Sequence, residues 1–369
     1  MDAVIKRSRI VRQWLVGLLG SWACVWLAGP WVVNSILIRV ADPELNAITL
    51  REGDSIRWRS EGWATTHVGP HGMPGWKPNG SLERVVLWGD SQVEGFCTND
   101  DQKIHSHLIR LAEQAGRAID CIPVGRSGTD AIDWIELLPA VDELWRPRMH
   151  VFVVAELSDL MVLDPHQRST QEGDRWRSKS REPLRWVKSL RGEAAVQAAR
   201  NLVLDPSTGR LRTLRWSIGP MNAKASSNDN SEIDASDGSL KDGSRVSSLH
   251  ERIANVLAEL HSTLQGRLCI VYAPAVPRFA GEVVFSHPDD ASWDTLKSLL
   301  DQRSILAIDC RQAFIDQWNL SHTVTRGFHQ GQMSYGHLND LGNHVISMAI
   351  IEQLQVNDLL GQQGAGAAK

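Results

Sequence analysis

An apolar run that stops at a Gly-Asp-Ser turn most constrains what this chain can fold into. The run covers residues 85–88, and Gly89, Asp90 and Ser91 follow it directly, before a polar segment that is compatible with a helix. A short apolar run bounded by a turn is typical of a strand buried on both faces. In open α/β sheets, ligands bind just beyond the carboxyl ends of such strands. The pattern therefore predicts that the Ser91 hydroxyl stands at the ligand-binding edge of a sheet.

The rest of the chain alternates between helical and strand-like patterns. Helices are predicted at 103–114, 130–144, 248–265, 291–302 and 339–354, and strands at 118–124, 150–155, 267–273 and 305–309. Strands that alternate with helices imply a parallel sheet with right-handed crossover connections. We therefore expect one α/β domain over residues 81–355.

The N-terminal region predicts a membrane anchor. No charged residue occurs over residues 13–38, and a helix needs about 20 residues to cross a bilayer. Lysine and arginine precede this segment within residues 1–12, so the positive-inside rule places the N-terminus in the cytoplasm and the remainder in the periplasm. A cleaved signal peptide is the alternative. It is disfavoured because its apolar region spans only about 7–15 residues and because Pro30 spoils the small-residue site at Ala28-Gly29.

Three further segments differ from the α/β pattern. Residues 41–80 are expected to form a small β-element, with short strands at 47–50 and 55–59 on either side of a turn at Gly53-Asp54. An insertion at 165–246 contains a Ser-, Asp- and Asn-rich stretch, 221–247, that predicts disorder. We expect the insertion to be a surface loop, with a lid or a basic glycan-binding patch as the alternative. The tail, 356–369, is expected to be flexible.

Composition excludes several classes of partner and cofactor. The net charge of −4 gives no reason to expect a nucleic-acid partner. The five cysteines lack metal-ligand spacing, so buried free thiols are expected, with a disulfide among the last four as the alternative in an oxidising compartment. No Walker loop or GxGxxG turn is present, and neither a cofactor nor a metal is expected.

Four segments are predicted to converge on the carboxyl edge of the sheet, namely 89–91, 125–128, 156–159 and 336–339. This combination resembles the SGNH/GDSL hydrolase superfamily of esterases and carbohydrate O-acetyltransferases, over roughly residues 80–165 and 250–355. The membrane-anchored, extracytoplasmic members look most similar. The resemblance implies a flavodoxin-like α/β fold, a three-layer sandwich with a parallel sheet.

The resemblance also assigns roles to individual residues. Ser91 is expected to be the nucleophile and His337 the general base that takes its proton. The oxyanion hole would be formed by the backbone N–H groups of Ser91 and Gly128 and by the side chain of Ser158. The residues expected to support the site are Asp90, Asp159, Ser334 and Asn339.

Two positions depart from the family pattern. Family members usually carry asparagine where this chain has Ser158, and many carry aspartate three residues before the histidine, where this chain has Ser334. The working model is therefore a Ser–His dyad, in which a backbone carbonyl or the Ser334 hydroxyl accepts a hydrogen bond from His337. A remote acid, Asp309 or Asp340, is the alternative.

The expected function is that of a membrane-anchored serine esterase or carbohydrate O-acyltransferase or deacetylase. It would act through an acyl-serine intermediate on a glycan or acyl ester of the cell envelope. One alternative is a catalytically weak or inactive protein of the same fold that binds glycan or acts as a scaffold. Another is a subunit of an envelope assembly, held by its anchor and its insertion.

Overall fold

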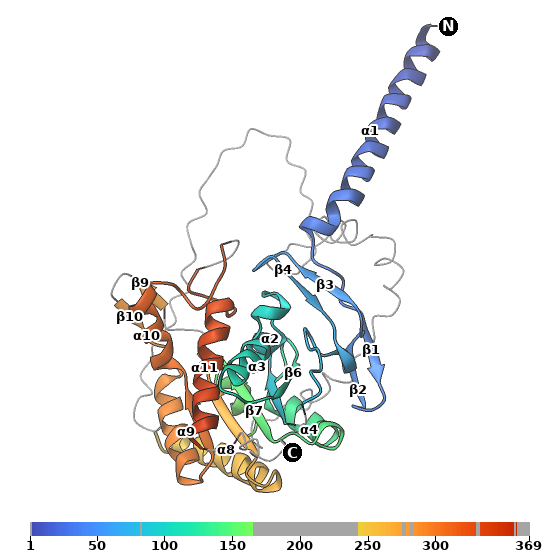
Figure 1. The fold of residues 1–369 in the computed structure, drawn as a ribbon. Coiled ribbons are helices and arrows are strands. Elements are labelled where there is room, and N and C mark those ends of the chain that lie inside the picture. Colours follow the sequence, from blue (N-terminus) through green and yellow to red (C-terminus); the bar gives the residue numbers. More distant parts are fainter. Residues whose placement is uncertain are drawn as a thin grey trace.

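A parallel sheet forms the centre of the molecule (Figure 1). The computed structural model describes residues 2–81, 83–164, 243–274, 278–280, 283–329, 333–357 and 359. The strands are β5 (Arg84–Gly89), β6 (Asp120–Gly125), β7 (Met149–Val154), β8 (Leu268–Tyr272) and β11 (Leu306–Asp309). They lie in the order β11-β8-β7-β5-β6, and every neighbouring pair is parallel. This is the 2-1-3-4-5 order of flavodoxin-like sheets, and it confirms the predicted α/β fold.

Helices cover both faces of the sheet because successive strand residues point to opposite sides. In β5, Val86 and Trp88 belong to one buried cluster and Val85 and Leu87 to another. The first cluster includes side chains of α4 (Ala131–Trp145), α8 (Gly243–Thr263) and α9 (Asp290–Gln302). The second includes side chains of α3 (Ile104–Gln114), α10 (Arg311–Ser321) and α11 (Asp340–Val356). The domain is thus a three-layer sandwich.

Some elements were not expected from the sequence. Helix α10 is one, because Phe314 is its only fully buried side chain and its apolar residues show little periodicity. The short antiparallel pair β9 (Arg278–Ala280) and β10 (Val283–Phe285) is another. Most of the predicted insertion, 165–242, lies outside the described residues, as do 358 and 360–369 of the tail. Helix α8 already begins at Gly243, within the stretch that was expected to be disordered.

The small β-element consists of two antiparallel pairs. Strand β1 (Arg39–Asp42) pairs with β2 (Ala47–Leu50), and β3 (Ser55–Trp58) pairs with β4 (Ala64–His67). The two strands expected on either side of Gly53-Asp54 are present as β2 and β3, but each pairs with another strand rather than across that turn. The β1–β2 turn is closed locally, because the Asp42 carboxylate accepts hydrogen bonds from the backbone N–H groups of Glu44 and Leu45 at 2.9 and 3.0 Å, an Asx turn.

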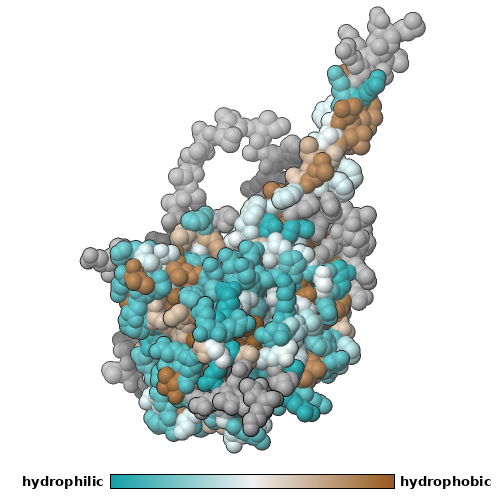
Figure 2. Space-filling view, in the orientation of Figure 1, coloured by the Kyte–Doolittle hydropathy of each residue, from teal (hydrophilic) through white to brown (hydrophobic). Residues whose placement is uncertain are grey.

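Helix α1 (Asp2–Val32) projects from the rest of the molecule (Figure 1). Within it, Ile10–Gly29 is long and apolar enough to cross a membrane, with a mean hydropathy of 1.4, and none of residues 10–28 is buried. Figure 2 shows apolar side chains along this helix, whereas the visible face of the domain is mostly hydrophilic. Length and composition alone also fit a signal sequence.

All five cysteines are free. Cys24 lies exposed on α1, and the other four are buried. The alternative of a disulfide among the last four is therefore wrong, and the expectation of buried thiols holds for those four. Burial raises the pKa of Cys121, Cys269 and Cys310 above the ordinary value, as expected for thiols in an apolar core.

Candidate active site

Ser91 lies in the turn that leaves the central strand β5. It is the first residue of the short helix α2 (Ser91–Glu94), and Asp90 is the N-cap, whose carboxylate accepts the backbone N–H of Gln92 at 2.9 Å. Such a cap satisfies one of the free donors at a helix start. The Ser91 hydroxyl is half-buried and donates to the other oxygen of Asp90 at 3.3 Å. The strand and its cap thus fix the serine at the carboxyl edge of the sheet.

A glycine on the neighbouring strand allows this turn to fold where it does. Gly125 ends β6 and stands opposite Gly89 in the register. A Cβ atom at Gly125 would lie 2.3 Å from the backbone nitrogen of Glu94. Because only glycine permits so close an approach, helix α2 can pack directly against the end of β6.

His337 lies in the loop that leads into α11. Asn339 is the N-cap of that helix: its Oδ1 accepts the N–H of Gly342 at 3.0 Å, and its Nδ2 donates to the carbonyl of Val324 at 2.8 Å. The carbonyl of His337 accepts the N–H of Gly327 at 2.9 Å. These bonds hold the loop on both sides of the imidazole.

One side chain joins the serine segment to the histidine segment. Gln92, next to Ser91, accepts the N–H of Leu338, next to His337, at 3.0 Å. The two segments therefore lie side by side, although 246 positions separate these two residues in sequence. Among the described residues, the hydrogen bond of the Ser91 hydroxyl goes to Asp90, and no hydrogen bond joins it to His337.

A buried arginine, Arg326, links the serine segment to the histidine segment. Arg326 donates through Nη1 to the side-chain oxygen of Gln92 at 3.3 Å and to the carbonyl of Gly336 at 3.0 Å, and through Nη2 to the carbonyl of Ala273 at 2.5 Å. Burial lowers the pKa of Arg326 to about 10, so the guanidinium remains charged at neutral pH. It ties α2, the His337 loop and the end of β8 to one another.

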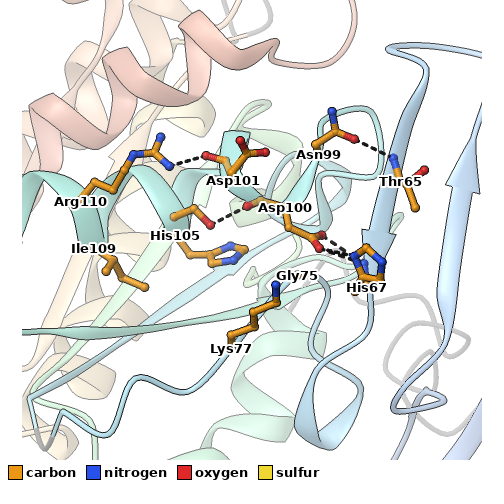
Figure 3. Close-up of a pocket in the computed structure, with 11 residues that line it drawn as sticks. Thr65, His67, Gly75, Lys77, Asn99, Asp100, Asp101, His105, Ile109 and Arg110 are labelled. Atoms are coloured by element: carbon orange, nitrogen blue, oxygen red, sulfur yellow. Dashed lines mark hydrogen bonds and ion pairs between the residues drawn. The ribbon is translucent and has the colours of Figure 1, made fainter.

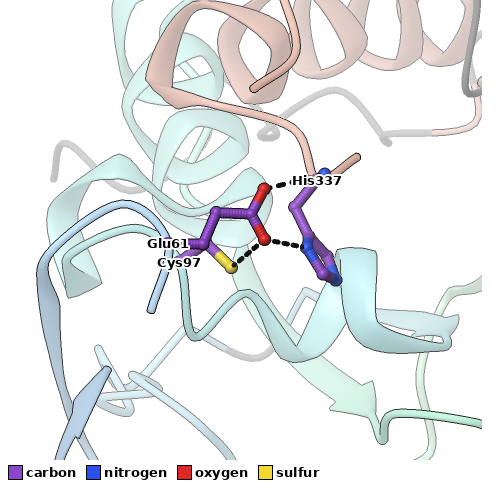
Figure 4. A group of neighbouring side chains, drawn as sticks. All are labelled: Glu61, Cys97 and His337. Carbon is purple, nitrogen blue, oxygen red and sulfur yellow. Dashed lines mark hydrogen bonds and ion pairs between the residues drawn. The ribbon is translucent and has the colours of Figure 1, made fainter. Parts of the chain in front are cut away.

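The partner of His337 is Glu61, in the loop between β3 and β4 (Figure 4). Nδ1 of His337 lies 2.7 Å from Oε2 of Glu61, and the backbone N–H of His337 donates to Oε1 at 3.3 Å. Partial burial opposes ionisation of Glu61, but the hydrogen bonds from His337 outweigh it and hold the pKa of Glu61 below the ordinary value. An ionised carboxylate only accepts, so Nδ1 carries the proton and Nε2 of the neutral ring is free to accept one.

This arrangement corrects the expected dyad. Ser334 is not the partner of His337: it adopts a positive φ of 63°, and its N–H donates to the carbonyl of Arg326 at 3.0 Å. The two remote acids are occupied elsewhere, since Asp309 pairs with Arg311 and Asp340 with His107. Glu61 was missed because it lies in a different structural element and at no fixed spacing from His337.

Close packing of backbone against backbone brings Glu61 to the site. The next residue, Gly62, has a φ of +75°, and a Cβ atom there would lie 1.7 Å from the carbonyl oxygen of Cys97. A side chain at this position would push the β3–β4 loop away from the domain. The same loop is tied to the end of α1: Asn34 Oδ1 accepts the N–H groups of Arg59 and Ser60.

The predicted oxyanion residues occupy the same edge. Gly128 follows β6, is exposed and has a φ of +78°, and a Cβ atom at this position would meet nothing within 4 Å, so backbone conformation rather than crowding requires glycine. Ser158 follows β7 as the first residue of α5 (Ser158–Met161), where it is exposed, and Asp159 is half-buried beside it. Strands β6 and β7 flank β5, so these residues stand on either side of the Ser91 turn.

A surface cavity of about 540 Å³ lies where the small β-element meets the domain (Figure 3). Its lining includes Thr65 and His67 of β4, and Asn99 and Asp100 before α3. The Asn99 side chain accepts the N–H of Thr65 at 3.0 Å, and the Asp100 carboxylate lies 2.8 Å from Nδ1 of His67. Ser91 and His337 are not among its lining residues. These contacts hold the element that carries Glu61.

Comparison with known proteins gives distant structural likenesses only. No family model and no curated protein matches the chain. Among solved structures, the acetyl xylan esterase AlAXEase is similar with 13% identity, a TM-score of 0.38, and coverage of 73% of this chain and 99% of that one. The acetylxylan esterase Axe2 of Geobacillus stearothermophilus is similar with 10% identity and a TM-score of 0.37, and the match covers 77% of this chain and 96% of that one. A lipase/acylhydrolase of Enterococcus faecalis is similar with 11% identity and a TM-score of 0.35, and the match covers 74% of this chain and 96% of that one. All three TM-scores are below 0.5.

Proposed function

We propose that the protein is a serine esterase or O-acyltransferase of SGNH/GDSL type, in which Ser91, His337 and Glu61 form the triad. One observation carries this proposal: Nδ1 of His337 is held at 2.7 Å by the carboxylate of Glu61. A carboxylate at Nδ1 fixes the tautomer that a general base needs and stabilises the imidazolium that forms during the reaction. The contact of Gln92 with Leu338 supports the placement of the serine beside that base.

In the proposed reaction, the Ser91 hydroxyl turns from Asp90 towards His337 when an ester binds. The oxygen attacks the ester carbonyl carbon while Nε2 of His337 takes the hydroxyl proton, and the imidazolium then gives that proton to the departing alcohol. The acyl group is left on Ser91. Water or a sugar hydroxyl next gives its proton to Nε2 and attacks the acyl carbon, which releases a carboxylic acid or forms a new ester and restores the serine.

The charge that develops on the carbonyl oxygen requires donors at the same edge. We assign this role to the backbone N–H groups of Ser91 and Gly128 and to the Ser158 hydroxyl. A serine hydroxyl is shorter than the asparagine amide that the family pattern carries. Because one lost oxyanion donor costs about 10²–10³ in rate, we expect Ser158 to set a modest turnover.

The substrate and the location form part of the same proposal. The exposed apolar helix α1 would anchor the protein, with the basic residues 1–12 in the cytoplasm and the domain in the periplasm. An acylated glycan of the cell envelope is then the substrate within reach of a tethered domain. Neither a cofactor nor a metal takes part in the proposed reaction.

Hydrolysis of p-nitrophenyl acetate by the full-length chain in detergent tests the proposal. We expect Ser91→Ala to abolish the activity and labelling by a fluorophosphonate probe, while Ser127→Ala, one strand away, retains both. Activity that survives Ser91→Ala would rule out the serine mechanism.

A second candidate is a glycan-binding protein that keeps the fold without the reaction. It is favoured by the Ser91 hydroxyl, which is bonded to Asp90 rather than to His337. This candidate predicts no fluorophosphonate labelling together with measurable binding of acetylated polysaccharide. Labelling at Ser91 excludes it.

A further inference from the structure

Besides His337, the Glu61 carboxylate contacts a second residue that the proposed reaction does not use. Cys97 is 3% exposed, and its sulfur lies 3.6 Å from Oε2 of Glu61, the same oxygen that holds Nδ1 of His337 (Figure 4). One ligand atom from each of the three residues lies within 4.8 Å of the other two. The residues occupy positions 61, 97 and 337. Because they lie far apart in sequence, no ligand-spacing motif indicates the cluster.

The three donors match the preferences of a thiophilic divalent cation. Zn²⁺ takes thiolate, imidazole and carboxylate ligands in tetrahedral sites, and sites with three protein ligands keep a fourth position for water. Bond lengths of about 2.0–2.3 Å place tetrahedral ligand atoms roughly 3.3–3.6 Å apart. The Sγ–Oε2 separation of 3.6 Å already fits this spacing. The separation of Nδ1 from Oε2, 2.7 Å, has to open by a side-chain adjustment of Glu61.

Backbone contacts, and not only side-chain contacts, hold the three residues in place. Glu61 is positioned by Gly62, which packs on the Cys97 carbonyl, and His337 by backbone bonds to Gly327. The sulfur itself is buried, whereas the imidazole and carboxylate are 30% and 21% exposed. A cation can therefore enter from the side of His337 and Glu61 and reach the sulfur beneath them.

We propose that Glu61, Cys97 and His337 form an inhibitory binding site for Zn²⁺ or Cd²⁺. The cation replaces the proton on Nδ1 of His337 and the proton on the Cys97 thiol. The ring proton moves to Nε2, the thiol proton passes to the buffer, and the Glu61 carboxylate turns from Nδ1 to the metal. An imidazole that carries metal on Nδ1 and a proton on Nε2 cannot accept the serine proton, so an occupied site blocks the base.

The inhibitory part of this inference rests on the proposed function, but binding does not, and the two are measured separately. Binding of Zn²⁺ to the full-length chain in detergent is measured by equilibrium dialysis. Co²⁺ serves as a spectroscopic probe, because a cobalt–thiolate bond gives a charge-transfer absorption in the near ultraviolet. We expect Cys97→Ala to lose this absorption and to weaken the tightest Zn²⁺ site by at least about tenfold. Cys121→Ala, a buried thiol in β6, is the matched control and should change neither.

The activity arm compares each variant with its own metal-free rate. We expect Zn²⁺ to inhibit p-nitrophenyl acetate hydrolysis by the wild type and by Cys121→Ala, with reversal by a chelator, and to inhibit Cys97→Ala at least about tenfold more weakly. Equal binding and equal inhibition of the two variants would overturn the metal site and leave the esterase standing. Binding that depends on Cys97 in a wild type without esterase activity would keep the metal site and refute the proposed function.

Discussion

Glu61 holds His337 with both carboxylate oxygens, one on the ring and one on the backbone N–H. A single residue thus sets both the position of the loop and the tautomer of the ring. The two effects can be separated by a substitution that keeps the shape of the side chain and removes its charge.

We expect Glu61→Gln to lower kcat by about 10²–10⁴ with little change in KM, because an amide can donate to Nδ1 and leave the imidazole in the wrong tautomer. Steady-state hydrolysis of p-nitrophenyl acetate measures this. Ser334→Ala is the control and should stay within about threefold of the wild type. A strong loss in Ser334→Ala with a mild one in Glu61→Gln would restore the dyad that the sequence suggested.

His150 lies buried in the centre of the sheet and is expected to make stability depend on pH. Trp88 donates to Nδ1 at 3.1 Å, and Nε2 lies 3.2 Å from Asp142, which also pairs with Arg267. Burial lowers the pKa of His150 to about 4 despite Asp142. The folded state therefore resists a proton that the unfolded chain accepts below pH ~6.5.

The free energy of unfolding should thus fall as pH drops from ~6.5 to ~4, and His150 should account for about 3 kcal/mol of that loss. Urea titrations at both ends of this range measure it. His150→Gln should be markedly less sensitive to this pH change, whereas the exposed His322→Gln should behave like the wild type. An unchanged pH dependence in His150→Gln would contradict the assignment.

The sequence indicates some residues of the candidate site and gives no indication of others. Ser91 and His337 could be placed because each adjoins a long, strongly patterned element, β5 and α11. Glu61 could not, since its position depends on how the small β-element docks, through Gly62 and Asn34, and no periodicity records that docking. The free thiol of Cys97 gave no signal for the same reason.

At the scale of elements, the segment between α1 and β1, residues 33–38, forms a strap that holds the loop that carries Glu61. The Asn34 side chain accepts the backbone N–H groups of Arg59 and Ser60. The N–H of Ser35 donates to the carbonyl of Arg57 at 2.8 Å, and the N–H of Arg57 donates to the Ser35 hydroxyl at 3.0 Å. Glu61 directly follows these residues. The strap therefore belongs to the folded domain, although it adjoins the apolar helix.

A chain that begins at Ala41 should accordingly be at least about tenfold less active than one that begins at Val33, because the loop that carries Glu61 loses its hydrogen bonds. Rates on p-nitrophenyl acetate, a soluble substrate, make the comparison independent of a membrane. Asn34→Ala in the longer chain should show a loss of about threefold to tenfold, since two hydrogen bonds to backbone are removed. Equal activity of the two truncated chains would show that the strap is dispensable.

Some elements could be predicted from the sequence pattern and others could not. The sheet strands and the long helices follow from buried runs and 3.6-residue periodicity. Helix α10 escaped because it buries one residue fully. In the β-element, the turn at Asp42 joins β2 to β1, and β3 pairs with β4.

At the scale of the whole molecule, α1 stands out among the described helices by the apolar surface that it exposes. Its apolar side chains are exposed from Ile10 to Val32, which is unfavourable in water at about 25 cal/mol per Å² of apolar surface. A bilayer removes that cost.

We expect the full-length protein to remain in the membrane pellet after alkaline carbonate extraction, and the chain that begins at Val33 to be soluble and active. Protease added to spheroplasts should digest the domain and spare residues 1–12. Recovery of the full-length gene product as a soluble protein lacking its first 30 or so residues would identify α1 as a cleaved signal.

The chain order of the triad has a consequence for biogenesis. The carboxylate is synthesised first, the alcohol 30 positions later, and the imidazole near the end. A nascent or truncated polypeptide therefore contains a nucleophile but no base. Under the proposed mechanism, ester cleavage therefore requires that the last helix has docked, and an incompletely made copy is inactive.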